Sequence, residues 1–495
     1  MNISKFLMTG FLGMTLSSGL FAQDHKKPNV LFIFADDLTF ESLQTLNNSE
    51  AITPNLDRLR NRGVTFTHAF NQGSWTPAVC AASRAMMNTG SYLWKAAQYC
   101  RSAQSKKPSE MPACPVQKKA PKGYLSEFMK AAGYDTYFTG KWHVEIDAHK
   151  VFDEVGTVRG GMPNQTEARY KRKFIKGQPD TWDPTDKSNG GYWKGGKHWS
   201  EVVRDETLGF MDIAKKKSNP FFMYIAFNAV HDPRQAPQEY EDMYNAEDLS
   251  IPKSFLPEYP YCEEAGSGHN LRDERLAPFP RTKYSVQVNR KEYYALLTHM
   301  DHQIGIILDS LKAIGEEDNT YILFTADHGL ALGDHGFIGK QNMYDRSMRV
   351  PLFVVGPGIK AGKVVDDKVY LQDIMATALD IAGSDALNDM DFKSLLPVCE
   401  GKKDIAAQKA VYGAYMGYQR MVRTDKYKMI IYPLANVVRL YNIRKDPDEM
   451  NDLAGMKYKK VMDKLFVKFK ELQKEVMDPL DVTEYYNNYF KSLKN

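Results

Sequence analysis

The sequence predicts an α/β protein with a large mixed, mostly parallel sheet sandwiched by helices, followed by a smaller C-terminal antiparallel sheet plus one helix. Continuous apolar runs at residues 29–35, 220–228 and 320–326 are rich in β-formers, as expected of strands buried on both faces. Segments with helical spacing of apolar residues lie between these runs. After about residue 403, short strand-like runs alternate with turn residues, which indicates an antiparallel sheet.

Length and charge limit the possible classes of protein. The chain has 495 residues, of which 43% are hydrophobic, enough for one large domain and a smaller unit. Coiled-coil and disordered compositions do not fit these values. The formal net charge of +4 is small for this length, so we expect no nucleic-acid partner.

The N-terminal segment, residues 1–22, is typical of a cleaved secretory signal. It contains Lys5, an apolar core and the small residue Ala22 at its end. The alternative is a membrane anchor, but the apolar run is short and no stop-transfer run follows it. We therefore expect a periplasmic or secreted protein with no membrane span in the mature chain. Its large N-terminal domain is predicted at 23–403 and its C-terminal unit at 404–495.

Each expected element in the first half of the chain has a local signal. The first helix begins at Pro54 and ends at Gly63, and Gly133 similarly follows a later helix. The expected elements are a strand at 29–35, a helix at 54–63, a strand at 64–70, a helix entered near Cys80 after a turn at Pro77, a helix at 124–132 and a strand at 134–139.

The second half continues the alternation, and its clearest helix has apolar residues three and four apart over 293–311, closed by Gly315. The other expected elements are a helix at 201–214, strands at 220–228, 320–326 and 351–355, a helix at 371–382, short strands at 412–416, 420–423, 428–432 and 439–441, and a closing helix at 462–476.

Two long segments, 160–199 and 257–281, show no clear periodicity and are predicted to be loops. Long loops in compact domains are usually functional or disordered. Trp182, Trp193 and Trp199 in the first loop suggest stacking on sugar rings, and its lysines suggest contacts with anionic groups. The alternative is a surface insertion without a function.

Cys80 lies at the entry of a predicted helix, in the segment Cys80-Ala81-Ala82-Ser83-Arg84. Backbone N–H groups and the positive end of the helix dipole gather there and favour an anionic group. Arg84 follows one helical turn later, so its guanidinium can share a face with Cys80. A nucleophile, a cation and backbone donors would then meet an oxyanion. The alternative is that Cys80 is a small buried hydrophobic residue or half of a disulfide.

Four of the predicted strands end in polar residues. These residues are Asp36 and Asp37, Lys141 and His143, His231, and Asp327 and His328. Because parallel strands bring their carboxyl ends to one edge of a sheet, these groups can converge. Three carboxylates and a histidine suit a divalent cation bound mainly by oxygen. Taken singly, each cluster also fits a capping aspartate or a surface lysine beside a hydrogen-bonded histidine.

With these motifs in this order, the chain resembles the formylglycine-dependent (type I) sulfatases of the alkaline phosphatase superfamily. The Cys80 segment is similar to their motif Cys-x-Pro/Ala-x-Arg, whose cysteine is oxidised to an aldehyde. The resemblance runs from Asn29 to the closing helix and implies an alkaline-phosphatase-like fold and a catalytic large domain. It implies a bacterial carbohydrate sulfatase, with a sulfated carbohydrate as substrate and a maturation enzyme acting on Cys80. Ala82 replaces a frequent proline, which points away from a maturation system that requires proline.

The resemblance also implies a role for each polar residue. The implied calcium ligands are Asp36, Asp37, Asp327, His328 and the aldehyde hydrate at Cys80. Many relatives have asparagine where His328 stands. Arg84 and Lys141 would hold the hydrate oxygens, and His143 would assist turnover of the sulfated intermediate. His231 and Lys340 would bind sulfate, with His231 as the acid for the leaving group.

Two other functions stay open at this point. A phosphate or phosphonate ester hydrolase would share the strand-end metal ligands, but many such enzymes use Thr or Ser where this chain has Cys80. A non-catalytic glycan-binding protein would leave Cys80 unmodified. The cysteines other than Cys80 allow three disulfide pairings, of which Cys100 with Cys114 is the closest in sequence.

Overall fold

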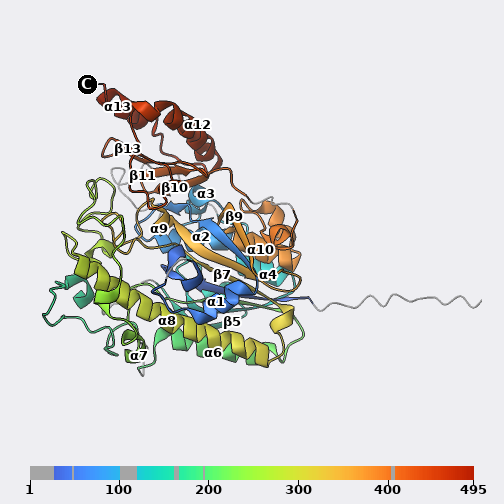
Figure 1. Cartoon of the computed structure of the whole chain (residues 1–495). Helices are drawn as coiled ribbons and strands as arrows, with labels where there is room; N and C mark the ends of the chain where they lie inside the picture. The colour runs from blue at the N-terminus through green and yellow to red at the C-terminus, as the bar shows by residue number, and fades with distance from the viewer. Residues whose placement is uncertain are drawn as a thin grey trace, which may run out of the picture.

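An eight-stranded sheet lies at the centre of the computed structural model, with strand order β5-β4-β6-β1-β7-β8-β2-β9 (Figure 1). The model describes residues 27–46, 49–100, 120–160, 167–192, 196–402 and 407–494. The strands of this sheet are β1 (Asn29–Ala35), β2 (Val64–Phe70), β4 (Asp135–Lys141), β5 (Glu154–Arg159), β6 (Phe221–Ala226), β7 (Thr320–Ala326), β8 (Arg349–Val355) and β9 (Lys363–Tyr370). Only β8 runs antiparallel to its neighbours, so the sheet is mixed and mostly parallel, as predicted.

The four central strands β4, β6, β1 and β7 are consecutive neighbours and all parallel. In β1, Ala35 pairs with Ala326 of β7, and Phe34 pairs with Ala226 of β6. These three strands therefore end at the same level. The segments that follow them leave the sheet at one edge, which is where an open α/β sheet binds its ligands.

Helices cover both faces of the sheet (Figure 1). One face carries α6 (Trp199–Ala214) and the long α8 (Lys283–Ala313), which pack together, and α1 (Pro54–Asn61) packs against α8. The other face carries α2 (Val79–Thr89), α4 (Leu125–Ala131) and α10 (Asp373–Ala382). The shorter helices are α3 (Leu93–Ala97), α5 (Ala148–Val151), α7 (Gln238–Glu241), α9 (Asp345–Met348) and α11 (Leu396–Cys399).

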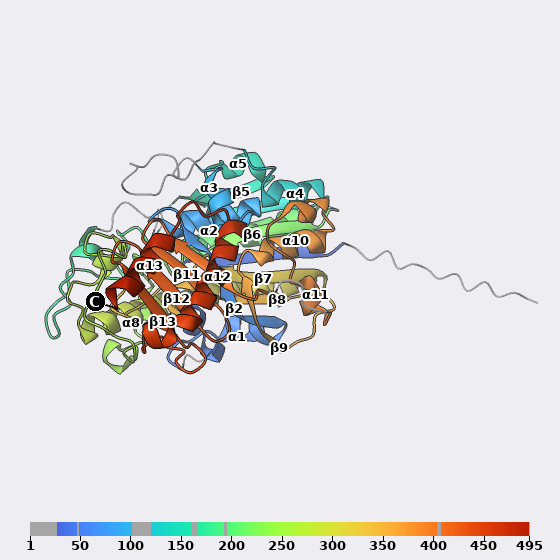
Figure 2. The ribbon, with the colours of Figure 1, turned by 90° about the horizontal axis from the view of Figure 1, so that it is seen from above.

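A five-stranded second sheet lies beyond α2, under α12 (Lys459–Glu475) and α13 (Thr483–Ser492) (Figure 2). Its strands are β3 (Gly73–Ser74), β10 (Val411–Tyr415), β11 (Gln419–Arg423), β12 (Lys428–Tyr432) and β13 (Val437–Tyr441). The last four form the predicted antiparallel meander, whereas β3 comes from the segment before Cys80 and pairs parallel with β10. The second sheet is therefore attached to the part of the chain that carries the Cys80 helix.

Some elements were not predicted from the sequence. The missed elements are the strands β3, β5 and β9, the short helices α3, α5, α7, α9 and α11, and α13, so the C-terminal unit has two helices where one was predicted. Strand β9 lies at an edge of the sheet and has exposed residues in its first half, so it lacks a continuous apolar run. Lys141 is the last residue of β4 and not a residue beyond the strand.

The stacking role suggested for the tryptophans of the first long loop is wrong for two of them. Trp182 and Trp199 are buried, with 4% and 2% of their surface exposed, so neither ring is available to a sugar. Trp193, the signal at 1–22, the boundary at 403 and Cys114 with its pairing lie outside the described residues. Within the described ranges, no helix has the length and apolar character needed to cross a membrane.

Candidate active site

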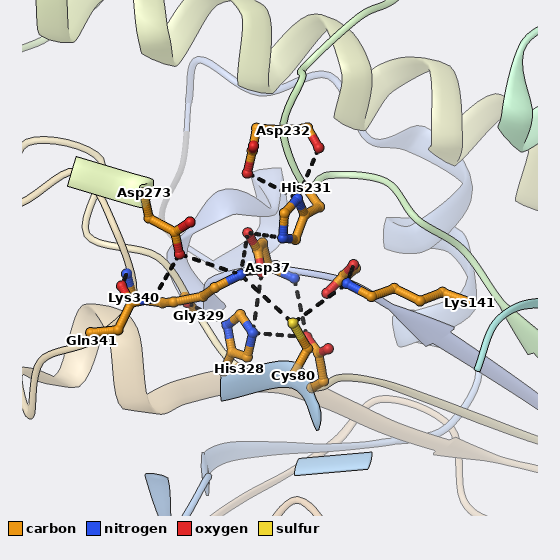
Figure 3. A network of polar contacts seen from close by, with 12 residues as sticks. Asp37, Cys80, Lys141, His231, Asp232, Asp273, His328, Gly329, Lys340 and Gln341 are labelled. Carbon is orange, nitrogen blue, oxygen red and sulfur yellow. Dashed lines mark hydrogen bonds and ion pairs between the residues drawn. The ribbon is translucent and has the colours of Figure 1, made fainter. Parts of the chain in front are cut away.

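The polar residues that follow β1, β4, β6 and β7 meet in one cluster beside Cys80 (Figure 3). Asp36, Asp37, His231, Asp327 and His328 are each at most 4% exposed. Cys80 reaches the cluster from the first turn of α2, as its place in the sequence predicted. The predicted convergence of strand ends is therefore present in the structure.

Gly140 positions Lys141 at this edge. It has a φ of +103°, and a Cβ atom added there would lie 1.8 Å from the carbonyl oxygen of Ala226 in β6. Only glycine therefore lets β4 end in such close contact with β6. The next residue, Lys141, then forms an ion pair with Asp36 at the end of β1.

Each of the three carboxylates contacts a cation, and one of them also accepts a hydrogen bond from the backbone of another. Asp37 Oδ1 accepts a hydrogen bond from Lys340 Nζ at 2.9 Å, and Asp327 Oδ2 accepts one from Arg84 Nε at 3.1 Å. The backbone N–H of Asp37 donates to Asp327 Oδ1 at 3.2 Å. Burial and the neighbouring Asp36 raise the pKa of Asp327 to about 7. Around Asp327, burial and a second carboxylate thus outweigh the effect of the neighbouring cations His328 and Arg84.

Two lysines flank the sulfur of Cys80. Lys141 Nζ lies 3.4 Å from Cys80 Sγ, and Lys340 Nζ lies 3.8 Å from it on the other side (Figure 3). Burial opposes ionisation of Cys80, but the two ammonium groups hold the pKa of its thiol well below its usual value. An anionic or developing anionic group at this position is therefore stabilised.

His231 is oriented by the residue that follows it. Its Nδ1 lies 2.9 Å from Asp232 Oδ1, while its Nε2 lies 3.8 Å from Asp37 Oδ2. The Tyr170 hydroxyl donates a hydrogen bond to the other oxygen of Asp232. Burial lowers the pKa of His231, but the carboxylates of Asp232 and Asp37 outweigh it and raise that pKa to about 10. His231 is thus held as a proton donor whose Nε2 faces the cluster.

The cluster has the donor atoms that a divalent cation needs. One ligand atom from each of Asp36, Cys80, Asp327 and His328 lies within 4.8 Å of every other. Two buried atoms among them lack a well-formed hydrogen bond: Asp36 Oδ1 lies 3.8 Å from Arg84 Nη2, and His328 Nε2 lies 3.2 Å from Asp37 Oδ1. The other ring nitrogen of His328 is 2.9 Å from the carbonyl oxygen of Gly329, which fixes the ring. Buried ligand atoms of this kind, gathered close together, fit a bound cation.

Arg84 and His143 lie differently with respect to the pocket. Arg84 is fully buried; its Nε pairs with Asp327, and its Nη1 donates to the backbone oxygen of Lys141 at 2.7 Å. It is not among the residues that line the pocket in front of Cys80, whereas His143 lines that pocket. The φ of +53° at His143 shows that the chain has left the extended conformation of β4 there. The roles predicted for both residues stay predictions.

Four residues of the site were not singled out from the sequence. Asp232 and Gln341 are adjacent to His231 and Lys340 in segments that the sequence analysis noted. Arg272 and Asp273 come from the long loop at 257–281, which was predicted to be functional or disordered as a whole. A pocket of about 190 Å³ opens in front of Cys80, and Arg272, Asp273 and Gln341 form part of its wall.

A buried cysteine between two lysines, a positioned histidine and clustered carboxylates at the carboxyl edge of a parallel sheet together define an enzyme that acts on an anionic ester. The chain matches the family model described as Sulfatase over residues 28–384. It also matches, over residues 333–475, the model described as N-sulphoglucosamine sulphohydrolase, C-terminal. The chain belongs to the sulfatase family, whose members hydrolyse sulfate esters.

Individual relatives extend over nearly the whole chain. An N-acetylglucosamine-6-O-sulfatase of Bacteroides thetaiotaomicron is 26% identical over 531 residues, covering 92% of this chain and 88% of its own. A solved structure in complex with its substrate D-glucosamine-2-N,6-O-disulfate has a TM-score of 0.69 and 22% identity, and the match covers 92% of this chain and 99% of that one.

The fold is also shared outside the sulfatases. A phosphonate monoester hydrolase of Silicibacter pomeroyi has a TM-score of 0.71 and 21% identity, with coverage of 92% of this chain and 96% of that one. At this identity the two solved structures establish a common alkaline-phosphatase-like fold, as the sequence analysis expected.

Proposed function

We propose that the protein is an exported sulfatase that hydrolyses sulfate esters of a carbohydrate, with Cys80 oxidised to formylglycine and a calcium ion beside it. The observation that carries this proposal is the position of Cys80 Sγ, 3.4 Å from Lys141 Nζ and 3.8 Å from Lys340 Nζ, at the edge where the carboxylates meet. A sulfate ester has non-bridging oxygens that carry negative charge, and this position offers them two cations.

The formylglycine and the calcium ion would have different roles in the reaction. Formylglycine supplies a hydrated aldehyde whose hydroxyl serves as nucleophile, and calcium supplies a positive charge that polarises the substrate anion. Asp36, Asp37, Asp327 and His328 are the proposed calcium ligands, because they contribute mainly oxygen. Asp36, Asp327 and His328 form one group of candidate ligand atoms with Cys80, and Asp37 Oδ1 lies 3.2 Å from His328 Nε2. Arg84 would neutralise the excess carboxylate charge from behind.

The remaining residues bind the sulfate and move protons. Lys141 and Lys340 would stabilise the charge on the sulfate oxygens. His231 would donate a proton from Nε2 to the departing alcohol, while Asp232 holds Nδ1. His143 lines the same pocket and would assist the step that regenerates the nucleophile.

The carbohydrate part of the proposal is supported by relatives. The N-acetylglucosamine-6-O-sulfatase from Bacteroides thetaiotaomicron covers almost the whole chain, and an N-acetylglucosamine-6-sulfatase from Homo sapiens is 28% identical over 440 residues. An arylsulfatase of Clostridium perfringens is 27% identical over 469 residues, so the names of these relatives share the sulfate ester and differ in the alcohol. Export is supported by the signal-like residues 1–22.

The test uses protein from the native source, or protein produced together with a formylglycine-generating enzyme. Mass spectrometry of the peptide carrying Cys80 should give the mass of the aldehyde or its hydrate. The same preparation should release sulfate from a panel of sulfated monosaccharides, and the Cys80→Ala variant should release none above background. An unmodified Cys80 in active native protein, or equal activity of the variant, would refute the proposed nucleophile.

A phosphate or phosphonate ester hydrolase is the second candidate, and the shared fold of the phosphonate monoester hydrolase favours it. Matched aryl sulfate and aryl phosphate esters separate the two, because the leaving group is then the same. Sulfatase function predicts a kcat/KM for the sulfate at least about 100-fold higher, a difference of about 3 kcal/mol in transition-state binding. The reverse order would favour the second candidate.

A further inference from the structure

Part of the wall of the pocket in front of Cys80 has no role in the proposed chemistry. Cys80, Lys141 and His231 line this pocket together with Arg272 and Gln341, to which no step has been assigned. A sulfate group bound beside Cys80 would leave the rest of its substrate within reach of these two side chains. They are therefore candidates for selecting the substrate.

Arg272 is held in a fixed position on that wall. Its Nε and Nη2 donate to the same oxygen of Asp273, Oδ1, at 2.8 Å and 2.5 Å. The Arg272 side chain is nevertheless 42% exposed, while that of Asp273 is only 3% exposed. In the described part of the chain, the side-chain hydrogen bonds found for Arg272 all go to Asp273. One end of the guanidinium is thus anchored by Asp273, and its other N–H groups, which also feel the charge of Asp232, make no hydrogen bond to a described residue.

Asp273 links Arg272 to the catalytic lysine loop. Its Oδ2 accepts a hydrogen bond from Gln341 Nε2 at 2.7 Å and lies 3.7 Å from Lys340 Nζ (Figure 3). One carboxylate therefore fixes Arg272 relative to Lys340, which lies 3.8 Å from Cys80 Sγ. Arg272 and Lys340 are therefore held at a fixed separation, which is what simultaneous binding of two acidic groups on one substrate requires.

The surface next to Arg272 continues this positive character. A groove of about 560 Å³ along the same loop is lined by Lys171, Lys173 and Arg275, together with Tyr170. Tyr170 lines the groove, and its hydroxyl donates a hydrogen bond to Asp232, the residue after His231. Tyr170 and Asp232 therefore connect the groove to His231 in the wall of the pocket. Glu167 partly offsets Lys171 and Arg275, at 3.1 Å and 3.8 Å.

We infer that Arg272 binds a second acidic group, a sulfate or a carboxylate, on the carbohydrate that carries the scissile sulfate. This inference rests on the proposed sulfatase function and names its substrate class as carbohydrates with at least two negative charges. A guanidinium forms strong, charge-assisted hydrogen bonds with both oxyanions. Because Asp273 already orients the side chain, little conformational entropy is lost on binding. A neutral hydroxyl would gain much less from the same contact.

The experiment compares three substrates on matured protein: a 6-O-sulfated hexosamine, the same sugar with a second sulfate, and the 6-O-sulfated sugar linked to a uronic acid. Arg272→Gln should raise the KM of the substrate that carries the recognised group by about 10- to 100-fold, the range of a charge-assisted hydrogen bond. The KM of the monosulfated sugar should change by less than about 3-fold. The KM of Arg272→Lys for that substrate should lie between the values of wild type and Arg272→Gln. A lysine keeps the charge but lacks the parallel N–H groups of the guanidinium.

Arg58→Gln is the matched control, because Arg58 is an exposed arginine on α1 that pairs with Asp309. It should leave all three KM values unchanged. An Arg272→Gln variant that changes every KM equally, or none, overturns the inference. The substrate whose KM rises, either the disulfated sugar or the sugar linked to a uronic acid, identifies which oxyanion Arg272 binds.

Binding measured without turnover separates this inference from the proposed function. In a Cys80→Ala background, calorimetric titration should show that Arg272→Gln weakens binding of a doubly charged sugar about 10-fold or more, and that of the monosulfated sugar little. Matured wild-type protein that releases no sulfate from any sugar would refute the proposed function alone. If every sugar binds equally well to the Cys80→Ala protein and to the Cys80→Ala protein that also carries Arg272→Gln, the selective role of Arg272 is refuted.

Discussion

At the residue scale, Lys141 and Lys340 determine the chemical state of position 80. Their ammonium groups lie on two sides of a buried sulfur and keep its pKa low against the effect of burial. The same charges would stabilise sulfate oxygens. Cys262 offers a contrast, because burial and the nearby Glu258 raise the pKa of its thiol to about 12.

This contrast predicts how the unmodified protein reacts. In protein produced without a maturation enzyme, iodoacetamide should alkylate Cys80 at pH 6 to 7, while Cys262 stays unreacted, because the thiolate is the nucleophile. Lys141→Gln should shift the alkylation profile of Cys80 to higher pH by about one unit or more. Peptide mass spectrometry over a pH series measures both profiles, with exposed Lys150→Gln as the control. Identical profiles for Cys80 in wild type and Lys141→Gln would contradict this explanation.

A second buried group, Glu241 of α7, predicts the pH dependence of stability. It is 2% exposed; burial and the neighbouring Glu292 raise its pKa from 4.5 to about 8, against the opposing effect of Lys291. Because the folded state holds the proton more tightly than the unfolded state, the free energy of unfolding decreases as pH rises from about 4.5 to 8. Removing the ionisable group should remove this decrease.

The Glu241→Gln variant therefore should gain stability relative to wild type between pH 5 and pH 8.5, by on the order of 1–3 kcal/mol. Urea unfolding at both pH values measures the change, with the exposed Glu239→Gln on the same helix as control. Parallel pH dependence in wild type and Glu241→Gln would show that Glu241 does not carry the effect.

At the element scale, the ends of β4 and β6 meet because Gly140 has no side chain. Gly140→Ala would place a Cβ atom 1.8 Å from a backbone oxygen of β6, at a φ of +103°. Gly133 has a similar φ of +87°, but a Cβ atom there would meet nothing within 4 Å. Comparing the two alanine variants therefore separates the effect of a steric clash from the effect of backbone strain alone.

Gly133→Ala should cost about 1 kcal/mol of unfolding free energy. Gly140→Ala should cost at least about 3 kcal/mol, in the range of severe overpacking, and should also lower activity because Lys141 moves. Thermal unfolding and sulfate release test the two variants together. Equal losses of stability would mean that β4 and β6 move apart without cost.

The elements also show what the sequence could predict. The apolar runs gave β1 and β7 with their observed bounds, because a strand buried on both faces leaves a continuous signal. Their polar ends correctly predicted a shared edge. The strands β5 and β9 lack such a run, since each has partly exposed residues along its length.

Residues from irregular segments could not be predicted individually. Arg272 and Asp273 enter the pocket from a loop whose path is set by distant partners such as Gln341, and no periodicity describes that path. Trp182 and Trp199 were expected to face a ligand but are buried, because composition alone does not show which way a loop side chain points. Asp232 was visible beside His231, but its contact with His231 depends on the local turn.

At the scale of the whole molecule, Asp345 holds the C-terminal sheet to the large sheet. It lies at the start of α9, just before β8, and accepts hydrogen bonds from Arg423 Nε at 3.0 Å and Lys428 Nζ at 2.8 Å. Arg423 and Lys428 belong to β11 and β12, and their side chains are 6% and 0% exposed. Burial removes the alternative of hydration, so Arg423 depends on this carboxylate, whereas Lys428 is also paired with Glu449, whose Oε1 lies 2.8 Å from the Nζ of Lys428.

Asp345→Ala should therefore cost about 3–5 kcal/mol, the range for removing one partner of a buried ion pair. Asp425→Ala is the control, because Asp425 pairs with Lys368 but its side chain is 68% exposed, so its loss should cost at most about 1 kcal/mol. Urea unfolding measures both values. A loss below about 1 kcal/mol for Asp345→Ala would show that the two sheets are held together without this contact.

In the proposed site, segments distant in sequence meet around one cation beside residue 80. The measurement that tests this most directly is a crystal structure of the matured protein with calcium. We predict one calcium ion with oxygen ligands from Asp36, Asp37 and Asp327 at about 2.3–2.6 Å, with His328 and the oxidised side chain at position 80 completing the shell. A calcium ion bound elsewhere, or these carboxylates held only by Lys141, Lys340 and Arg84 at saturating calcium, would contradict the account.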